Sequence, residues 1–475
     1  MSIITGKEYL WRINRLKADI WMDGERIVGE LSSHRAFSGV MRTQAELYDI
    51  QHASPELSFR QDTTGKRVSN SYKIPLTIED LIARRKLTEA WARHTGGLMG
   101  RSPDYMNTVL TAFRMSTIHL QKSETVHPDR LVAFYEEACE KDYSFTHTFM
   151  NPQRNRSQLA MLDDDCMNAH VVKTNQEGIV VKGAKLLATQ GGMTDELLVY
   201  SAPGVADKRH AYLFSVPTNT KGISYHCRES FKWDDIQYNA PLSSRFDEND
   251  ALVVFDEVLV PWERVFIYED ILATHQLYVK GYFTPLTLHT IVSRQVVKTE
   301  LLLGIAQSVV DAIGIGEYEH VQLKVAQIAK GLESMRALLH YAEQSGEKMD
   351  GYYIPNRIPL LVAVNTFQET YPRFTEIIEQ LGASGMITLF SEKDFESEVG
   401  EKLSYYLQTD VADGKEKVRL FRLAWDICMS PFGTRQTLYE RFFFGDAVRL
   451  AKMIYDIYPK DDGLALVSQL LKDTK

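Results

Sequence analysis

Cysteine is scarce in this chain. Its 475 residues include four cysteines, Cys139, Cys166, Cys227 and Cys428, and no two of them form a CxxC pair or a zinc-binding spacing. Iron–sulfur clusters and structural zinc sites need several thiolates close together, so the sequence argues against both. Widely separated cysteines are also typical of a reducing compartment.

Motifs that mark many well-known catalytic and nucleotide sites are absent. No GxGxxG follows a strand-like run, and GxxxxGK[ST], HExxH and GxSxG do not occur. These absences argue against a Rossmann dinucleotide site, a P-loop, a zinc-peptidase helix and the nucleophile elbow of α/β-hydrolases. The acidic run Asp163–Asp165 could chelate a cation, but such runs are usually solvated loops, and we predict no metal site.

Long apolar runs and basic clusters are also missing. No stretch of about 18 apolar residues is present, and Met1–Glu8 lacks the basic and apolar regions of a secretory signal. The net charge is −9 and the basic residues are scattered, which disfavours binding to nucleic acid or to an anionic membrane. We therefore expect a cytoplasmic protein that binds neither.

The composition that remains is that of an ordinary globular protein, 44% hydrophobic and 25% charged, long enough for two or three domains. Helical periodicity dominates the first part, although residues 32–72 show no period and are predicted to be extended. Short β-rich runs separated by turn residues follow, and helical patterns then return. We expect an α+β chain with a helical domain (1–142), a mainly antiparallel β domain (143–270) and a C-terminal helical region (271–475).

One apolar seam in the C-terminal region indicates a helix bundle. Its apolar residues alternate spacings of four and three, as in bundles whose long helices often pair between subunits. We therefore expect an oligomer. The seam consists of Val321, Val325, Ile328, Leu332, Met335 and Leu339.

A glycine-rich corner, Gly96–Gly100, is the first candidate for a functional site. Ser102 and Pro103 predict that a helix begins directly after it. Arg101 would then lie just outside this helix and Tyr105 on its first turn, so a guanidinium and a phenol could face one cavity. On spacing alone, an ordinary corner between two helices, with a surface arginine and a core tyrosine, is the favoured explanation, since such corners are common.

Three further polar or small-residue segments could contact a ligand. His147 and the cluster Gln153–Arg156 begin the β-rich part and offer imidazole, amide and guanidinium groups. The loop around Thr189 and the segment Gln380–Gly385 have small residues that permit close approach of a ligand. Each also has a plain structural interpretation, as a buried histidine, a solvated loop, a β-turn or a helix end.

Together, these segments carry a family resemblance. The runs Gly100–Asn107, Phe145–Thr148 with Asn151–Gln153, Ala188–Gly191, Leu381–Gly385 and Tyr439–Asp446 occur in this order. They resemble the oxygenase components of the 4-hydroxyphenylacetate 3-monooxygenase family over essentially the whole chain. The resemblance implies an acyl-CoA dehydrogenase-like fold, in which the C-terminal region is a four-helix bundle, and usually a homotetramer, a dimer of dimers.

The resemblance also implies an activity. Family members hydroxylate a phenol ortho to its hydroxyl, giving a catechol, with O2 and reduced FAD from a separate NAD(P)H-dependent flavin reductase, through a flavin C4a-hydroperoxide. A free phenol has a pKa near ~10 and is neutral at pH 7. Hydrogen-bond donors around its oxygen would favour the phenolate and activate the ortho carbon.

The resemblance carries over to individual residues. It places Arg101, Tyr105 and His147 around the phenolic oxygen and the reactive part of the flavin, and Ser201 and Ala202 at the far end of the substrate. The sequence has Gly-Asp-Ala where the family has Gly-Asp-Pro, a departure that leaves backbone contacts in place. The residues implied to contact FAD are His147, Thr148, Phe149, Gln153, Arg154, Asn155, Arg156, Thr189, Phe444, Gly445, Asp446 and Ala447, with Gln380, Gly382, Ala383 and Ser384 reaching the FAD of a neighbouring subunit.

Three other functions are alternatives at this point, of which the missing cysteines nearly exclude the first. A 4-hydroxybutyryl-CoA dehydratase shares the fold, but its iron–sulfur cluster has no cysteines here near Arg101. An acyl-CoA dehydrogenase would need a carboxylate base in the bundle, for which Glu300 and Glu369 are candidates. A non-catalytic helical scaffold is the alternative outside enzymes.

Overall fold

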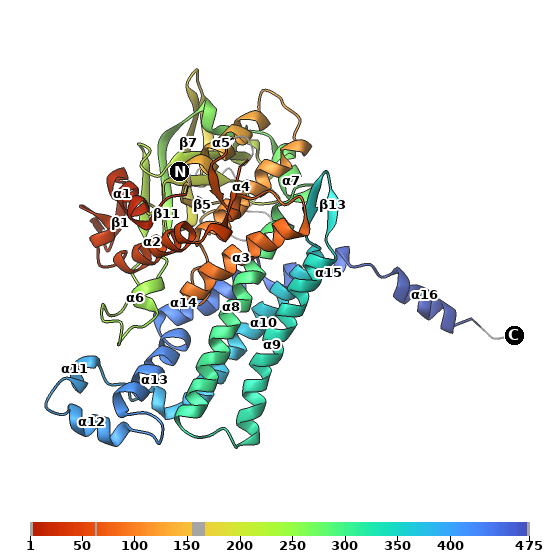
Figure 1. Cartoon of the computed structure of the whole chain (residues 1–475). Coiled ribbons are helices and arrows are strands. Elements are labelled where there is room, and N and C mark those ends of the chain that lie inside the picture. Colours follow the sequence, from red (N-terminus) through yellow and green to blue (C-terminus); the bar gives the residue numbers. More distant parts are fainter. Residues whose placement is uncertain (1–2, 62–63, 154–166, 473–475) are drawn as a thin grey trace.

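The computed structural model describes residues 3–61, 64–153 and 167–472. Helices come first, two β-sheets follow, and long helices form the remainder (Figure 1). Of the first five α-helices that the structure describes, all but α2 begin at a local sequence signal. Thr5 with Glu8 and Thr77 with Asp80 form capping boxes, and proline occupies the first turn of α4 and α5. These helices are α1 (Gly6–Leu16), α2 (Ser38–Ala53), α3 (Ile78–Thr95), α4 (Pro103–Ser116) and α5 (Pro128–Lys141).

The prediction of an extended segment over residues 32–72 is wrong for the part that forms helix α2. Its buried face includes Thr43, Gln44 and Gln51 beside apolar residues. Polar residues at buried positions remove the apolar period from which a helix is recognised. Thr43 donates to the backbone oxygen of Arg245 and Gln51 to Asp142, so tertiary contacts satisfy these polar groups.

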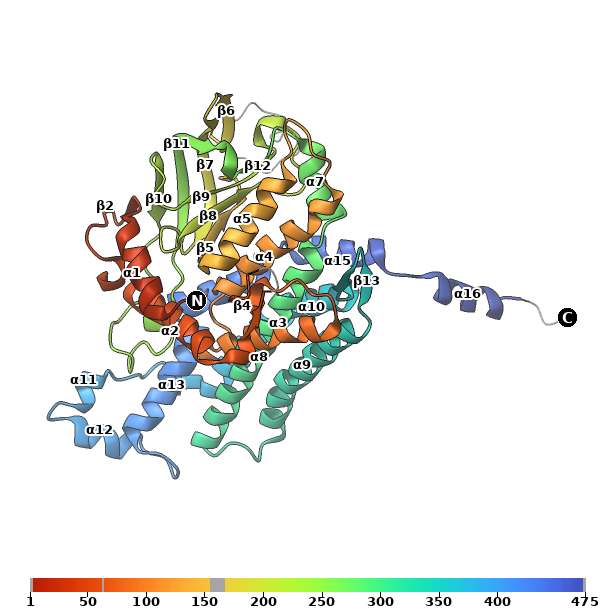
Figure 2. The same cartoon turned by 45° about the horizontal axis from the view of Figure 1, so that its top comes forward.

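Two sheets form the β part. The six-stranded sheet has the order β2-β1-β10-β11-β7-β6, and the four-stranded sheet has the order β12-β9-β8-β5. Most neighbouring strands are antiparallel, whereas β1 with β10 and β5 with β8 are parallel. Figure 2 shows α4 and α5 in front of the sheets. The strands are β1 (Ile20–Met22), β2 (Glu25–Arg26), β5 (Phe145–Thr148), β6 (His170–Thr174), β7 (Gly178–Thr189), β8 (Glu196–Tyr200), β9 (Tyr212–Pro217), β10 (Ile223–Cys227), β11 (Asp250–Pro261) and β12 (Val265–Tyr268).

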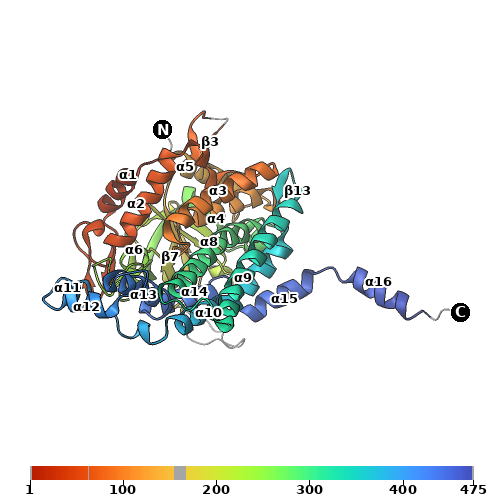
Figure 3. The same ribbon diagram turned by 60° about the horizontal axis from the view of Figure 1, so that its bottom comes forward.

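Four long helices, α8, α9, α10 and α13, pack together as the bundle (Figure 3). The predicted seam lies on α9, where five of its six residues are buried and Val325 is partly buried. Two small hairpins, β3 (Ser58–Arg60) with β4 (Arg67–Ser69) and β13 (Glu347–Met349) with β14 (Tyr352–Ile354), flank the helices. The remaining helices are α6 (Ser243–Phe246), α7 (Ile271–Val279), α8 (Phe283–Ala312), α9 (Glu319–Gln344), α10 (Arg357–Gly382), α11 (Glu392–Phe395), α12 (Gly400–Leu407), α13 (Gly414–Cys428), α14 (Pro431–Phe442), α15 (Ala447–Ile457) and α16 (Asp461–Leu470).

The last helix, α16, projects away from the rest of the chain, as all three views show (Figures 1, 2 and 3). All of its residues are exposed, including Leu464, Val467 and Leu470. Within the described ranges, no helix combines the length and the low charge needed to cross a lipid bilayer.

Candidate active site

The glycine corner between α3 and α4 holds Arg101 in a buried position. Gly96 and Gly97 adopt positive φ angles of 63° and 69°, which other residues rarely adopt, and the corner turns there. The backbone N–H groups of Gly100 and Arg101 both donate to the carboxylate of Glu248 at 2.7 Å. Ser102 stands at the N-cap of α4, as predicted, but its hydroxyl donates to Asp104 instead of capping the backbone.

Arg101 and Tyr105 face one another, as the spacing predicts. The guanidinium carbon of Arg101 lies 4.3 Å from the centre of the Tyr105 ring, and both residues are buried. Burial raises the pKa of Tyr105, and the charge of Arg101 partly offsets this rise. Among the described residues, Nε of Arg101 has no hydrogen-bond partner. A buried, unused donor is costly unless a ligand or water satisfies it, so this nitrogen is a candidate for binding a ligand.

His147, on β5, completes the predicted group of three. Its ring centre lies 6.0 Å from that of Tyr105, and neither ring nitrogen bonds to another described residue. Burial, with the charge of Arg101, lowers the pKa of His147 well below its ordinary value. The imidazole is therefore neutral at pH 7, with one nitrogen able to donate and one able to accept.

An aromatic layer extends this site along the four-stranded sheet. The rings of His147, Phe149 and Tyr200 are nearly parallel, with interplanar angles of 6° to 13° and centres 5.3 to 5.7 Å apart. Strands β5 and β8 are paired neighbours, which is why these side chains share one face. The hydroxyl of Tyr200 is buried without a hydrogen-bond partner in the described part of the chain, and Phe113 packs against its ring edge.

The segment after His147 is supported from the neighbouring strand β7. Thr148 donates to the backbone oxygen of Leu186 at 2.9 Å. The buried Lys185 donates to the oxygen of Phe149 at 3.2 Å and to the Asn151 side chain at 2.7 Å, and burial lowers the pKa of Lys185 to about 7. Gln153, two residues after Asn151, is exposed. The predicted contacts Arg154, Asn155 and Arg156, and the acidic run Asp163–Asp165, lie outside the described residues.

Thr189 and Ser201 both use their hydroxyls within the protein. Thr189 donates to Asp250 at 2.8 Å, and its backbone oxygen accepts from Thr146. The Ser201 hydroxyl donates to the oxygen of His210 at 2.6 Å, and its own backbone oxygen accepts from Tyr278. Ser201 directly follows Tyr200, so Ser201 and the half-buried Ala202 lie at one end of the aromatic layer.

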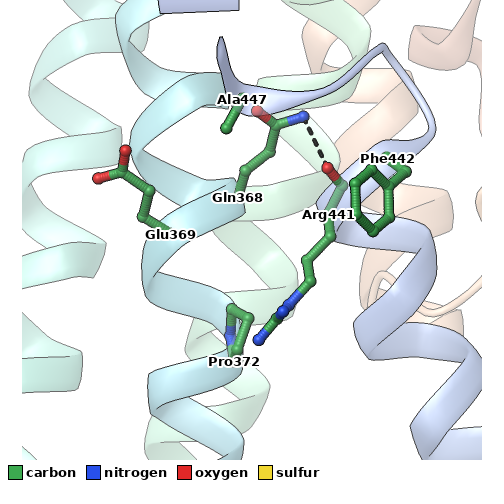
Figure 4. Close-up of a pocket in the computed structure, with 6 residues that line it drawn as sticks. All are labelled: Gln368, Glu369, Pro372, Arg441, Phe442 and Ala447. Atoms are coloured by element: carbon green, nitrogen blue, oxygen red, sulfur yellow. Dashed lines mark hydrogen bonds between the residues drawn. The ribbon is translucent and has the colours of Figure 1, made fainter.

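The segment Phe444–Ala447 also lies beside the site. Phe444 stacks on Phe283 at 6.5 Å, Phe283 stacks on Phe113, and the Arg101 guanidinium lies 5.7 Å from the Phe443 ring. Gln368, on α10, fixes the segment by donating to the backbone oxygens of Arg441 and Gly445. Figure 4 shows Gln368 with the other residues that line a cavity of about 400 Å³ beside this segment. That cavity contains none of the three predicted catalytic residues.

The segment at the end of α10 lies away from Arg101 in the same chain. Gln380 is 12 residues beyond Gln368 on one helix, a separation of about 18 Å along its axis. Gly382 packs near Met386, and Gly385 near Phe421, while Gln380, Ala383 and Ser384 are exposed.

The structure also bears on the alternative functions. Glu300 forms ion pairs with Arg93 and Arg336, and the exposed Glu369 lines the cavity of Figure 4. Neither carboxylate forms an ion pair with Arg101 in the described part of the chain. Among the residues that the structure describes, no group of three or more histidine, cysteine, aspartate or glutamate side chains is arranged to hold a metal ion.

Two residues beside the candidate site, Glu248 and Tyr439, were not predicted from the sequence. Glu248 is fully buried, and Gln190 donates both to it and to the oxygen of Arg101 at 3.1 Å. Arg101 donates to the hydroxyl of Tyr439 at 2.5 Å. Tyr439 lies in one of the matching runs, but its place in the site depends on a contact between residues 338 positions apart.

Comparisons with known proteins identify relatives over nearly the full length. A probable 4-hydroxyphenylacetate 3-monooxygenase of Bacillus subtilis is 46% identical over 99% of both chains. The 4-hydroxyphenylacetate 3-monooxygenase oxygenase component of Thermus thermophilus is 39% identical, covering 99% of this chain and 98% of that protein. A solved structure of such an oxygenase component with FAD and 4-hydroxyphenylacetate superposes with a TM-score of 0.93 at 39% identity, over 98% of both chains.

More distant structures share the fold. An archaeal 4-hydroxybutyryl-CoA dehydratase has a TM-score of 0.89 at 20% identity, and a glutaryl-CoA dehydrogenase has one of 0.52 at 14%. The acyl-CoA dehydrogenase-like fold expected from the sequence is thereby confirmed. Two family descriptions, the 4-hydroxyphenylacetate 3-hydroxylase N-terminal and C-terminal parts, match residues 5–267 and 274–472. The chain belongs to the 4-hydroxyphenylacetate 3-hydroxylase family.

Proposed function

We propose that the protein is the oxygenase component of a two-component flavin-dependent monooxygenase. It hydroxylates a phenol, 4-hydroxyphenylacetate or a similar compound, ortho to its hydroxyl and yields a catechol. The observation that carries the proposal is the convergence of Arg101, Tyr105 and His147 from a helix corner, a helix and a strand. The unused donor of Arg101 beside them supplies the hydrogen bond that a phenolic oxygen needs.

Each of the three residues has a distinct role. Arg101 keeps its charge and stabilises negative charge on the phenolic oxygen, which raises electron density at the ortho carbon. Neutral His147 donates to or accepts from the same oxygen. Tyr105 remains protonated because burial raises its pKa, so its hydroxyl can pass the phenolic proton on.

The residues around this group fit a flavin. The flat rings of His147 and Phe149 at the end of β5, and of Phe443 and Phe444 just after α14, suit a planar ring system. We assign Thr148, Gln153, Arg154, Asn155, Arg156, Thr189 and the segment Phe444–Ala447 to FAD of the same subunit, and Gln380, Gly382, Ala383 and Ser384 to FAD of a neighbouring subunit. Held by these residues as FADH2, the cofactor would supply an electrophilic oxygen atom derived from O2.

The far end of the substrate faces Ser201 and Ala202 in this proposal. The segment 203–209, which follows them, is exposed or half-buried, and Asp207 pairs with Arg209 inside it. By covering the bound substrate, this segment would exclude water and protect the reactive flavin from unproductive decay.

The proposal extends to partners and organisation. A separate NAD(P)H-dependent reductase supplies the reduced flavin, and the chain works as a cytoplasmic homotetramer. Residues 1–142, 143–270 and 271–475 act as three domains whose junction is the site. The exposed apolar residues of α16 support the oligomer, because such residues are normally covered.

A single-turnover experiment tests this function. Protein, chemically reduced FAD and 4-hydroxyphenylacetate are mixed with oxygenated buffer, and the catechol is quantified by chromatography. We expect catechol in proportion to the protein, and much less from a variant carrying both Arg101→Ala and His147→Ala. A transient flavin spectrum without catechol would reject this phenol as the substrate. No transient and no catechol would contradict the monooxygenase.

A further inference from the structure

Tyr439, on α14, lies directly against the corner that carries Arg101. Nη1 of Arg101 donates to the Tyr439 oxygen at 2.5 Å and to the Gly100 oxygen at 3.0 Å. The Tyr439 hydroxyl in turn donates toward the oxygen of Gly100 at 3.4 Å. A Cβ atom on Gly100 would lie 2.3 Å from the Tyr439 oxygen, so only glycine at this position lets the phenol ring approach.

Helix α14 is fastened to the same corner by buried polar contacts. Gln436 donates to the oxygen of Leu98 at 3.0 Å. Arg294 donates both to the oxygen of Gly97 and to the carboxylate of Glu440, at 2.8 Å each. Because these groups flank Tyr439 on the helix, its ring has little freedom to move relative to the corner.

The protonation state of Tyr439 suits a hydrogen-bond acceptor. Burial raises the pKa of Tyr439 to about 12, with Arg101 and Arg294 opposing the rise, so the phenol is neutral at pH 7. The ring stacks on Phe443 with centres 4.5 Å apart, which holds the hydroxyl in the plane facing Arg101. A neutral hydroxyl binds a guanidinium nitrogen without cancelling its charge.

We propose that Tyr439 is the positioning residue of Arg101 and so sets how strongly the site ionises a bound phenol. The Tyr439 oxygen accepts a hydrogen bond from Nη1 of Arg101, which leaves Nε and Nη2 as the donors for the phenolic oxygen. The C-terminal helices thereby contribute to the activation of a substrate bound between the helix corner and the sheet. This inference rests on the proposed phenol site and adds to it a residue that does not touch the substrate.

The ionisation of a bound coloured phenol provides the test. 4-Nitrophenol absorbs visible light as its phenolate, so its apparent pKa in the complex can be titrated without flavin or turnover. In Tyr439→Phe, which removes one oxygen atom, we expect this pKa to be higher than in the wild type by about one unit. Catechol formation from 4-hydroxyphenylacetate should fall about tenfold, an effect of similar energy, while binding of reduced FAD stays within twofold.

Two further variants make the result decisive. Tyr371→Phe is the matched control, because Tyr371 is a buried tyrosine of α10 whose hydroxyl has no partner among the described residues, and it should behave as the wild type. Gly100→Ala displaces the Tyr439 ring and should shift the nitrophenol titration in the same direction as Tyr439→Phe. An unchanged titration and rate in Tyr439→Phe would overturn the inference. Absence of both a flavin transient and catechol from the wild type would instead refute the proposed function, while the titration would still decide the role of Tyr439.

Discussion

Arg101 has a buried nitrogen, Nε, without a partner in the described part of the chain, and its guanidinium lies over the rings of Tyr105 and Tyr439. Lysine would keep the charge but lose the fork of donors that can bind Tyr439 and a phenolic oxygen together. For Arg101→Lys we expect catechol formation to fall about 10²-fold, the usual effect of removing a donor from developing negative charge. The single-turnover yield of catechol measures this fall. Arg93→Lys is the control, because Arg93 is an exposed residue of α3 that forms an ion pair with Glu300.

A result close to wild type for Arg101→Lys would show that charge alone suffices at this position. The geometric role assigned to the guanidinium would then be wrong.

The buried, neutral His147 predicts a pH dependence of stability. Its pKa is lowered in the folded protein, so between that low value and about 6.5 the unfolded chain binds more protons. The contribution of His147 is complete above pH 6.5, and stability is lost as the pH falls below it. We expect the melting temperature of His147→Gln to fall less than that of the wild type between pH 7 and pH 5.

Thermal unfolding at both pH values, compared with His320→Gln on the exposed end of α9, separates this effect from other titrating groups. Parallel pH profiles for wild type and His147→Gln would contradict the assignment of a neutral, buried imidazole.

At the scale of single elements, the placement of α14 depends on a buried charge cluster. Glu440 accepts from Arg294, Lys298 and Gln295, and these charges lower its pKa to about 2 despite the opposing effect of burial. Glu440→Gln leaves the two cations without a full counter-charge, and we expect a loss of about 3–5 kcal/mol in the free energy of unfolding. Urea denaturation measures this loss.

The exposed pair of Lys452 and Asp456 supplies the control, because Asp456→Asn should change stability by no more than about 1 kcal/mol. The contribution of Glu440 is present above pH 4.5 and is lost as the pH falls toward 2. Equal effects of the two substitutions would show that the cluster does not hold α14.

The segment 203–209 carries a second prediction at this scale. Replacing residues 204–207 by a shorter glycine turn opens the end of the aromatic layer without touching Arg101, Tyr105 or His147. We expect more hydrogen peroxide per reduced flavin consumed and a broader range of phenols accepted, because water then reaches the site. A peroxidase-coupled assay measures the peroxide, and unchanged peroxide with unchanged selectivity would contradict a covering role.

At the scale of the whole molecule, α16 exposes apolar side chains that no other described part of the same chain covers. Leu464, Val467, Leu470 and Leu471 recur at helical spacing and are more than half exposed. If α16 docks on a second copy, a chain ending at Tyr458 should dissociate into smaller oligomers at micromolar concentration. Light scattering after size-exclusion chromatography measures the mass, and Asp461→Asn on the polar side is the control. An unchanged mass would place the subunit contacts elsewhere.

Much of the fold and of the site was predictable from local sequence. Helix starts are marked by capping boxes at Thr5 and Thr77 and by prolines at Pro103 and Pro128. These starts are predictable because each marking residue lies within four residues of the helix turn that it stabilises. Short runs such as Gly100–Asn107 and Phe145–Thr148 identified the family. The roles proposed for Arg101, Tyr105 and His147 rest on those runs.

Only the tertiary structure decided how these parts meet. The parallel pairing of β1 with β10, the polar face of α2, and the contacts of Glu248 and Tyr439 with the Arg101 corner all join residues far apart in the chain. Local periodicity reports which face of an element is buried, but not what lies opposite it. The sequence alone determined the residue types of the site, whereas long-range packing determined the direction in which Arg101 points.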